Sequence, residues 1–157
     1  MKVSDPEQIP HQRLRPFLRF WNAKRGARRW PERAAIQLDD LRGAAANVAF
    51  CRGEHPFRDL DSLRLANGGR AVERATSHDL TGLTIGQVVD AFGSSAEFTR
   101  CFAEYGVSAS EGSCSYNEGR FPWPNQNWLV YRRLVMPLGS GDRPDGLFVV
   151  IDANAVG

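Results

Sequence analysis

Long apolar runs are missing from this chain, and so are the features of an export signal. The longest uninterrupted apolar run, Leu147–Ile151, is far shorter than the ~20 residues that a membrane-spanning helix needs. Residues 1–7 lack the apolar core and the small-residue cleavage site of a secretory signal. We therefore expect a cytoplasmic protein without a membrane span.

Cysteine is also scarce, and its spacing excludes two common roles. Cys51, Cys101 and Cys114 are an odd number of cysteines without Cys-x-x-Cys spacing, so they fit neither a disulfide framework nor a tetrahedral zinc site. The histidines are isolated as well, without the H-x-x-x-H spacing of a metal-binding helix. We predict buried, reduced thiols and no metal site.

Signatures of catalysis are equally sparse. Ser113, Cys114 or Ser115 could supply a nucleophile, but no G-x-S-x-G turn accompanies them and no His lies nearby in the sequence. We predict that the protein is not an enzyme.

Net charge is small but unevenly distributed. The chain carries a formal charge of +2, and residues 1–43 hold ten Lys/Arg against five Asp/Glu. The basic segment 24–33 could contact phosphates. The modest net charge and the lack of a reading motif favour instead a solvated surface or an acidic partner, which leaves nucleic acid as the weaker alternative. The residues that would carry nucleic-acid binding are Arg25, Arg28, Arg29 and Arg33.

What is present suits one globular domain. The 157 residues include 42% apolar and 24% charged side chains, close to the averages of globular proteins. Between residues 12 and 24, apolar side chains at i, i+3, i+4 and i+7 predict an amphipathic helix. This stripe either packs against the sheet of its own chain or forms an interface with a second copy or a partner protein, and both can hold. Its members are Leu14, Phe17, Leu18 and Trp21.

Five further segments have the composition of strands. Alternating or continuous apolar patterns predict strands over 48–52, 63–65, 113–116, 128–138 and 146–152. Gly and Asn clusters separate them, and residues 117–119 are among these expected breaks. The last two strands should pair antiparallel.

Short helices are expected between the second and third of these strands. Capping boxes at Thr84 with Gln87, and at Ser94 with Glu97, predict two helix starts. Apolar residues from Phe98 to Tyr105 then repeat with helical spacing, and Gly106 is the residue type expected just after a helix end.

This order of elements is an α+β pattern, with short helices on one side of an antiparallel sheet. We divide the chain into residues 1–34, an N-terminal amphipathic helix and basic connector, and residues 35–157, the domain that holds the sheet.

Several short motifs carry a family resemblance. They are Phe20-Trp21, Lys24-Arg25-Gly26, Pro31-Glu32-Arg33, Asp79-Leu80-Thr81-Gly82 and Arg133-Leu134-Val135-Met136-Pro137-Leu138. In this order and spacing the chain resembles a family of single-domain PAS-like proteins of alphaproteobacteria, over roughly residues 17–152. The resemblance implies a five-stranded antiparallel sheet curled around a small cavity. It also implies a regulatory role in signal transduction, through a bound small molecule or through dimerisation by flanking helices.

Five residues are candidates for lining that cavity: Arg133, Tyr131, Phe50, Phe148 and His78. Arg133 lies in an otherwise apolar strand, where its guanidinium would bind an anionic ligand group or form a salt bridge. The expected partners of that salt bridge are Asp152 and Asp79. His78 is a possible haem ligand or an exposed turn residue.

We therefore expect a non-catalytic regulatory domain of PAS type that senses a signal or binds a protein. The alternative is a ligand-storing domain or small enzyme on the same fold, with Tyr131, Arg133 and Asp152 as its interior polar groups. The resemblance does not name the ligand or the cofactor.

Overall fold

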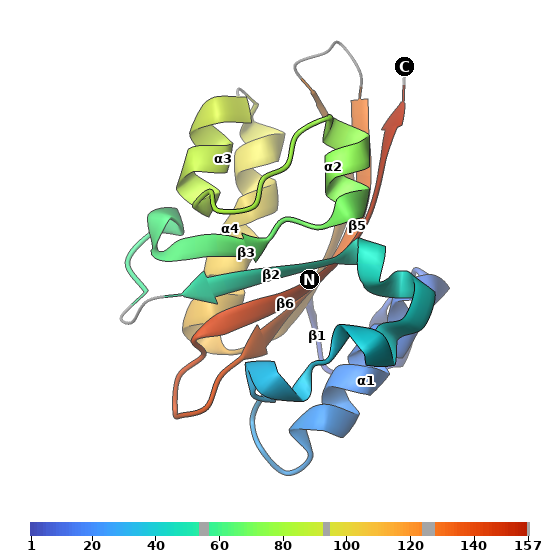
Figure 1. Ribbon diagram of the computed structural model, residues 1–157, viewed down its shortest axis with the longest axis vertical. Coiled ribbons are helices and arrows are strands. Elements are labelled where there is room, and N and C mark those ends of the chain that lie inside the picture. The colour runs from blue at the N-terminus through green and yellow to red at the C-terminus, as the bar shows by residue number, and fades with distance from the viewer. Residues whose placement is uncertain (54–56, 93–94, 124–127, 157) are drawn as a thin grey trace.

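The protein is a mixed α+β molecule built on one six-stranded antiparallel sheet with strand order β1-β4-β5-β6-β2-β3 (Figure 1). The computed structural model describes residues 1–53, 57–92, 95–123 and 128–156. The strands are β1 Lys2–Val3, β2 Val48–Gly53, β3 Leu63–Asn67, β4 Cys114–Pro122, β5 Trp128–Leu138 and β6 Gly146–Val156. The helices are α1 Arg15–Arg25, α2 Arg70–Thr76, α3 Ile85–Phe92 and α4 Ala96–Glu111, with 3₁₀ segments over Leu38–Asn47 and shorter stretches elsewhere.

Side-chain alternation along the strands divides the core into two layers, one on each face of the sheet. Helices α2, α3 and α4 lie on one side, and α1 lies on the other (Figure 1). On β2, for example, Cys51 packs in the cluster that contains α3 and α4, whereas Phe50 packs in the cluster that contains α1. The sheet is therefore covered on both faces.

Helix α1 buries its apolar stripe against the sheet of its own chain. Leu14, Leu18 and Trp21 are buried, and the indole Nε1 of Trp21 donates to the carbonyl of Pro137 at 2.8 Å. Phe17 stays half-buried. Of the two roles expected for this stripe, packing within the chain is present, and it hides three of the four residues from any partner.

The strands differ from the sequence-based expectation at several places, and β3, for example, continues to Asn67. Strand β4 continues to Pro122 through residues 117–119, because each of these pairs with β5. Strand β6 extends to Val156, paired along its whole length with β5. Strand β1 was not expected, since a two-residue strand has no sequence pattern of its own; Val3 pairs with Cys114 of β4.

Helix α4 is longer than its sequence suggested, and Gly106 is not its end. The helix runs on to Glu111 and ends at Gly112, which has φ +70°. Gly106 is buried within it, where a Cβ would lie 2.9 Å from Cζ of Phe57. A close contact, and not a helix stop, explains this glycine. The N-cap is Ser95, whose hydroxyl accepts from the backbone N–H of Phe98; the expected cap, Ser94, lies outside the described residues.

The other capping box is present as expected. The backbone N–H of Gln87 donates to Oγ1 of Thr84 at 3.0 Å, and Oε1 of Gln87 accepts from the backbone N–H of Thr84 at 2.9 Å. In the four described stretches of the chain, no helix combines the length and apolar character needed to cross a bilayer.

Candidate functional site around Arg133

Arg133 lies at the middle of β5, with its side chain enclosed between the sheet and α4. Its exposure is 2%. Its Nη1 donates to Sγ of Cys101 at 2.7 Å, and its Nη2 donates to the carbonyl of the same residue. Oε2 of Glu104, one helical turn further on, lies 3.8 Å from Nη2. The guanidinium is thereby bound to α4.

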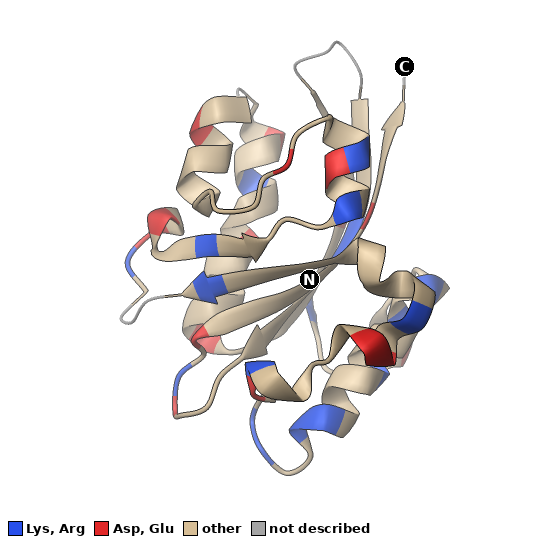
Figure 2. Cartoon of the chain, in the orientation of Figure 1, with Lys and Arg blue, Asp and Glu red and all other residues tan. Residues whose placement is uncertain are grey.

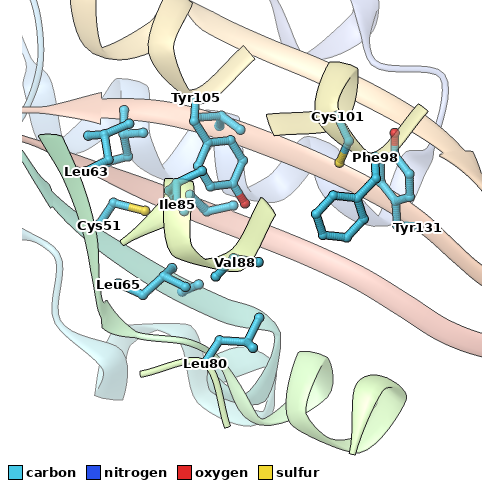
Figure 3. Packing of buried hydrophobic residues seen from close by; sticks show 14 of the residues in the cluster. Cys51, Leu63, Leu65, Leu80, Ile85, Val88, Phe98, Cys101, Tyr105 and Tyr131 are labelled. Atoms are coloured by element: carbon cyan, nitrogen blue, oxygen red, sulfur yellow. The ribbon is translucent and has the colours of Figure 1, made fainter. Parts of the chain in front are cut away.

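Three aromatic rings surround the same guanidinium. Its central carbon lies 4.6 Å from the ring centroid of Tyr105, 5.5 Å from that of Tyr131 and 5.9 Å from that of Phe102. Tyr105 and Cys101 project from α4 into the same layer as Tyr131 of β5 (Figure 3). Cation–π contacts of this kind offset part of the cost of burying a charge. Burial lowers the pKa of Arg133, but the surrounding groups more than compensate and leave it above its ordinary value.

Glu104 extends the cluster to the edge of the sheet. Its Oε1 accepts from the amino group of Met1 and from Nδ2 of Asn117, each at 3.2 Å. Oδ1 of Asn117 accepts in turn from the hydroxyl of Tyr131 at 2.5 Å. One polar network therefore connects the N-terminus, α4, β4 and β5.

The salt-bridge partners expected from the sequence are wrong. Asp152 pairs with Arg132 at 3.8 Å, on the opposite face of the sheet, because neighbouring strand residues point to opposite sides. Asp79 accepts from the backbone N–H of Thr81 at 3.0 Å, a bond that lowers the pKa of its carboxyl. Glu104 takes the place that both were expected to fill.

The two predicted cavity phenylalanines do not share a site with Arg133. Phe50 and Phe148 stack on each other with ring centroids 5.6 Å apart, in the layer that contains α1. The guanidinium carbon of Arg33 lies 3.6 Å from the centroid of Phe50. The predicted set of lining residues is therefore divided between the two faces of the sheet and does not line one common cavity, although Phe50 lines a separate pocket of about 410 Å³.

His78 is exposed and lies outside the Arg133 cluster. It follows α2, where its Nδ1–H donates to the carbonyl of Thr76 at 2.7 Å. Its ring packs edge-on against Phe92, with centroids 4.8 Å apart. This geometry is that of the turn residue expected as the alternative to a haem ligand.

The residues around Arg133 can hold a charged group in place, but they are poorly suited to nucleophilic or acid–base chemistry. Burial raises the pKa of Cys51 to about 12 and also raises the pKa of Tyr105. Both groups are consequently protonated at neutral pH and are poor nucleophiles or bases. Within residues 1–53, 57–92, 95–123 and 128–156, no three His, Cys, Asp or Glu side chains are grouped to hold a metal ion.

The described surface pockets do not include Arg133 in their linings. One of about 320 Å³ lies between α1, β1 and the start of β4, and we call it the α1–β4 pocket. Others of about 410, 300 and 640 Å³ include Arg33, Arg143 and Arg70, respectively, in their linings. From the sequence, Arg25 and Arg29 were identified only as members of a basic segment. Lys2 is distant from them in the sequence and lines the same pocket only in the folded chain, so the sequence did not indicate this site.

A second surface feature that the sequence did not reveal is an exposed apolar pair at one end of the sheet. Trp128 and Val156 are 41% and 47% exposed, and they face each other across β5 and β6. The guanidinium of Arg120 lies over the Trp128 ring at 4.7 Å.

Comparison with known proteins adds no assignment. No known protein family matches the chain, and no curated protein matches it in sequence.

Proposed function

We propose that this chain is a non-catalytic regulatory domain of PAS type that acts through contact with a second copy of itself. Strands β2 and β3, three helices and then strands β4–β6 follow the order that the family resemblance implies. Helix α1 contains the Phe20-Trp21 motif of that resemblance, and strand β1 is an addition to the order.

The observation that carries this proposal is the filled interior between α4 and the sheet. Arg133, Tyr105 and Phe98 are among the largest fully buried side chains, and Arg133 is bonded to α4 of its own chain. These side chains occupy the layer in which a cavity ligand of a PAS domain would lie. Because the interior is occupied, the favoured route for a signal is the molecular surface.

The exposed pair of Trp128 and Val156 supplies a surface of the right kind. Aromatic residues and Arg are enriched at protein interfaces, and here Arg120 lies directly over Trp128. A two-fold contact brings the same patch together twice, which doubles a small apolar area. A second copy therefore buries this patch without a further specialised partner.

Replacement of Trp128 tests this role. We expect Trp128→Ser to weaken self-association by about tenfold or more, because it removes the largest exposed ring of the patch. Val107 is also exposed and apolar, but it lies on α4, away from this patch. Val107→Ser is therefore the matched control and should leave association unchanged. Sedimentation equilibrium measures both. A wild-type protein that stays monomeric at the highest concentration that remains in solution would contradict the proposal.

Ligand binding at Arg133 is the second candidate, and one observation favours it. The buried Nε–H of Arg133 has no hydrogen-bond acceptor among the described residues, although buried guanidinium donors are ordinarily satisfied. A small carboxylate would supply that acceptor if α4 moved away from the sheet far enough to admit it.

The test compares two neighbouring arginines that point to opposite faces. If a carboxylate binds at Arg133, a panel of small carboxylates should include one that raises the melting temperature of wild-type protein and of Arg132→Met but not of Arg133→Met. A panel without effect on the wild-type protein, or with equal effects on both variants, argues against this role.

A further inference from the structure

The α1–β4 pocket has a composition that differs from that of the other pockets. Lys2 of β1, Arg25 at the end of α1 and Arg29 of the following connector all line it. Figure 2 shows the concentration of Lys and Arg along α1 and this connector. None of the described residues that line it is Asp or Glu. The other three linings contain Asp145, Asp142 with Glu111, and Glu73, respectively.

Arg25 is held in place within this pocket. Its Nε donates to Oδ1 of Asn22 at 3.1 Å, its Nη1 donates to the carbonyl of Arg28 at 2.9 Å, and its guanidinium lies over the Trp21 ring at 5.5 Å. Burial raises the pKa of Cys114 on the pocket wall to about 12, and the charge of Arg25 opposes that rise. A fixed cation of this kind loses little side-chain entropy when it binds an anion.

Arg29 and Lys2 complete the positive side of the pocket. The guanidinium of Arg29 lies over the Trp30 ring at 4.7 Å, and no carboxylate among the described residues lies within 4.0 Å of it. Lys2 pairs with Glu111, which is half exposed and not part of this lining. Among the described residues, neither Arg25 nor Arg29 forms a salt bridge, although Arg29 also borders the pocket of about 300 Å³ that contains Glu111 and Asp142.

The floor of the pocket is apolar. Leu18 and Trp21 of α1 and Val3 of β1 contribute to it. The Oγ atom of Ser113, on the same lining, is buried without a hydrogen-bond partner among the described residues. The pocket thus offers cations, one unused hydroxyl and an apolar surface to the same occupant.

We propose that the α1–β4 pocket binds a small organic anion, with a carboxylate or phosphate group on Arg25 and Arg29 and an apolar or aromatic body against the edges of Trp21 and Val3 that remain accessible. The volume of about 320 Å³ is at the lower end of small-molecule sites. This site lies on the face of the sheet opposite to Arg133, and it does not depend on self-association.

The same geometry disfavours nucleic acid as the occupant. Arg28 pairs with Glu32 at 3.0 Å, and Arg33 packs on Phe50 beside a different pocket. Only two of the four arginines that a basic strip would need line the α1–β4 pocket, so they do not form the continuous positive surface that tracks a phosphate backbone.

Benzoate and phenyl phosphate are suitable probes, since each joins one anionic group to one ring. Isothermal titration at low salt should give a dissociation constant of about 1 mM or tighter for one of them, and the preferred probe identifies the anionic group. In ¹⁵N-resolved NMR, the backbone N–H signals of Asn22, Ser113 and Cys114 should shift on titration.

Matched charge changes decide whether the pocket is responsible. Arg25→Gln should weaken binding about tenfold or more, since it removes a hydrogen bond between charged groups. Arg29→Gln, which breaks no hydrogen bond among the described residues, should weaken binding several-fold and covers the case in which Arg25→Gln does not fold. Arg28→Gln removes the same charge from the same segment and should leave the affinity unchanged.

Three outcomes would overturn the proposal. One is that neither probe binds, and another is that Arg28→Gln weakens binding as much as the pocket variants do, which would indicate diffuse surface charge. The third is that a labelled DNA duplex binds in place of the probes and depends on all four arginines.

Discussion

At the scale of residues, the feature with the largest expected effect on stability is the buried Arg133. Its main acidic partner, Glu104, lies 3.8 Å away and also contacts other groups. Glu104 contacts Arg133 through one oxygen, while its other oxygen accepts from Met1 and Asn117. A buried guanidinium without an acid nearby is costly, because Cys101 supplies only neutral acceptors. The contribution of Glu104 to stability is therefore larger than that of a surface acid.

Glu104→Gln tests this contribution. We expect the free energy of unfolding to fall by about 2 kcal/mol, because the charge of Arg133 loses its compensation while the amide keeps part of the hydrogen bonding. Glu111→Gln removes an exposed pair with Lys2 and should cost less than about 0.5 kcal/mol. Urea unfolding measures both variants, and equal effects would contradict the role given to Glu104.

A second residue-scale prediction concerns Cys51. Burial raises its pKa from 9.0 to about 12 in the folded protein, an effect that the charge of Arg133 partly opposes. Above about pH 9 the unfolded chain releases this proton and the folded chain does not, so stability falls as the pH rises towards 12. Between about pH 8 and about pH 10.5, wild-type protein should lose about 2 kcal/mol more stability than Cys51→Ala. Parallel losses in the two proteins would contradict the prediction.

Some residues of the candidate site could be predicted from the sequence, and others could not. The polar position within an apolar strand correctly predicted a buried Arg133. Its partner could not be predicted, because Glu104 reaches it through the placement of α4, which no local pattern encodes. Phe50 and Phe148 were expected to line the same cavity as Arg133 but lie in the other layer, since strand alternation separates two faces without saying which face a helix will cover.

At the scale of elements, helix ends determine how α4 sits on the sheet. Ser95 caps its start, and Gly112 ends it in a left-handed conformation. A Cβ at Gly112 would lie 2.5 Å from Cζ3 of the buried Trp30, in addition to the strain of φ +70°. Trp30 belongs to the opposite core layer, so this glycine lets the two layers approach each other.

Gly112→Ala tests how much the close contact between Gly112 and Trp30 contributes to stability. The substitution should destabilise the protein by more than about 1 kcal/mol, the cost expected from the positive φ alone, because Trp30 must also move. Gly141→Ala, at a loop glycine with no atom within 4 Å of its would-be Cβ, should change stability by less than about 0.5 kcal/mol. Thermal unfolding compares them, and a neutral Gly112→Ala would show that Trp30 does not restrict this site.

Element prediction succeeded where a pattern is local and failed where tertiary pairing decides. The boundaries of β5, those of β2 to within one residue, and the Thr84 capping box follow from alternation and hydrogen-bonding residue types. Residues 117–119 contain Asn and Gly, yet they stay in β4 because β5 pairs with all of them. Gly106 has the residue type of a helix end, but its contact with Phe57 is visible only after folding.

At the scale of the whole molecule, the sheet separates the two candidate ligand sites, one at Arg133 and one in the α1–β4 pocket. The layer with α4 holds Arg133 and is filled with its own side chains, whereas the layer with α1 has the cationic α1–β4 pocket at its edge. The exposed Trp128 and Val156 lie at the end of the sheet. This arrangement allows a small anion and a second subunit to bind at separate surfaces.

Self-association is the central claim, and native mass spectrometry of mixed chains tests it most directly. Unlabelled and ¹⁵N-labelled protein are combined after separate purification and measured under non-denaturing conditions. The proposed two-fold contact predicts three dimer masses, with a mixed species between the two pure ones, each near twice the 17.5 kDa of the chain. Monomer masses alone would contradict it.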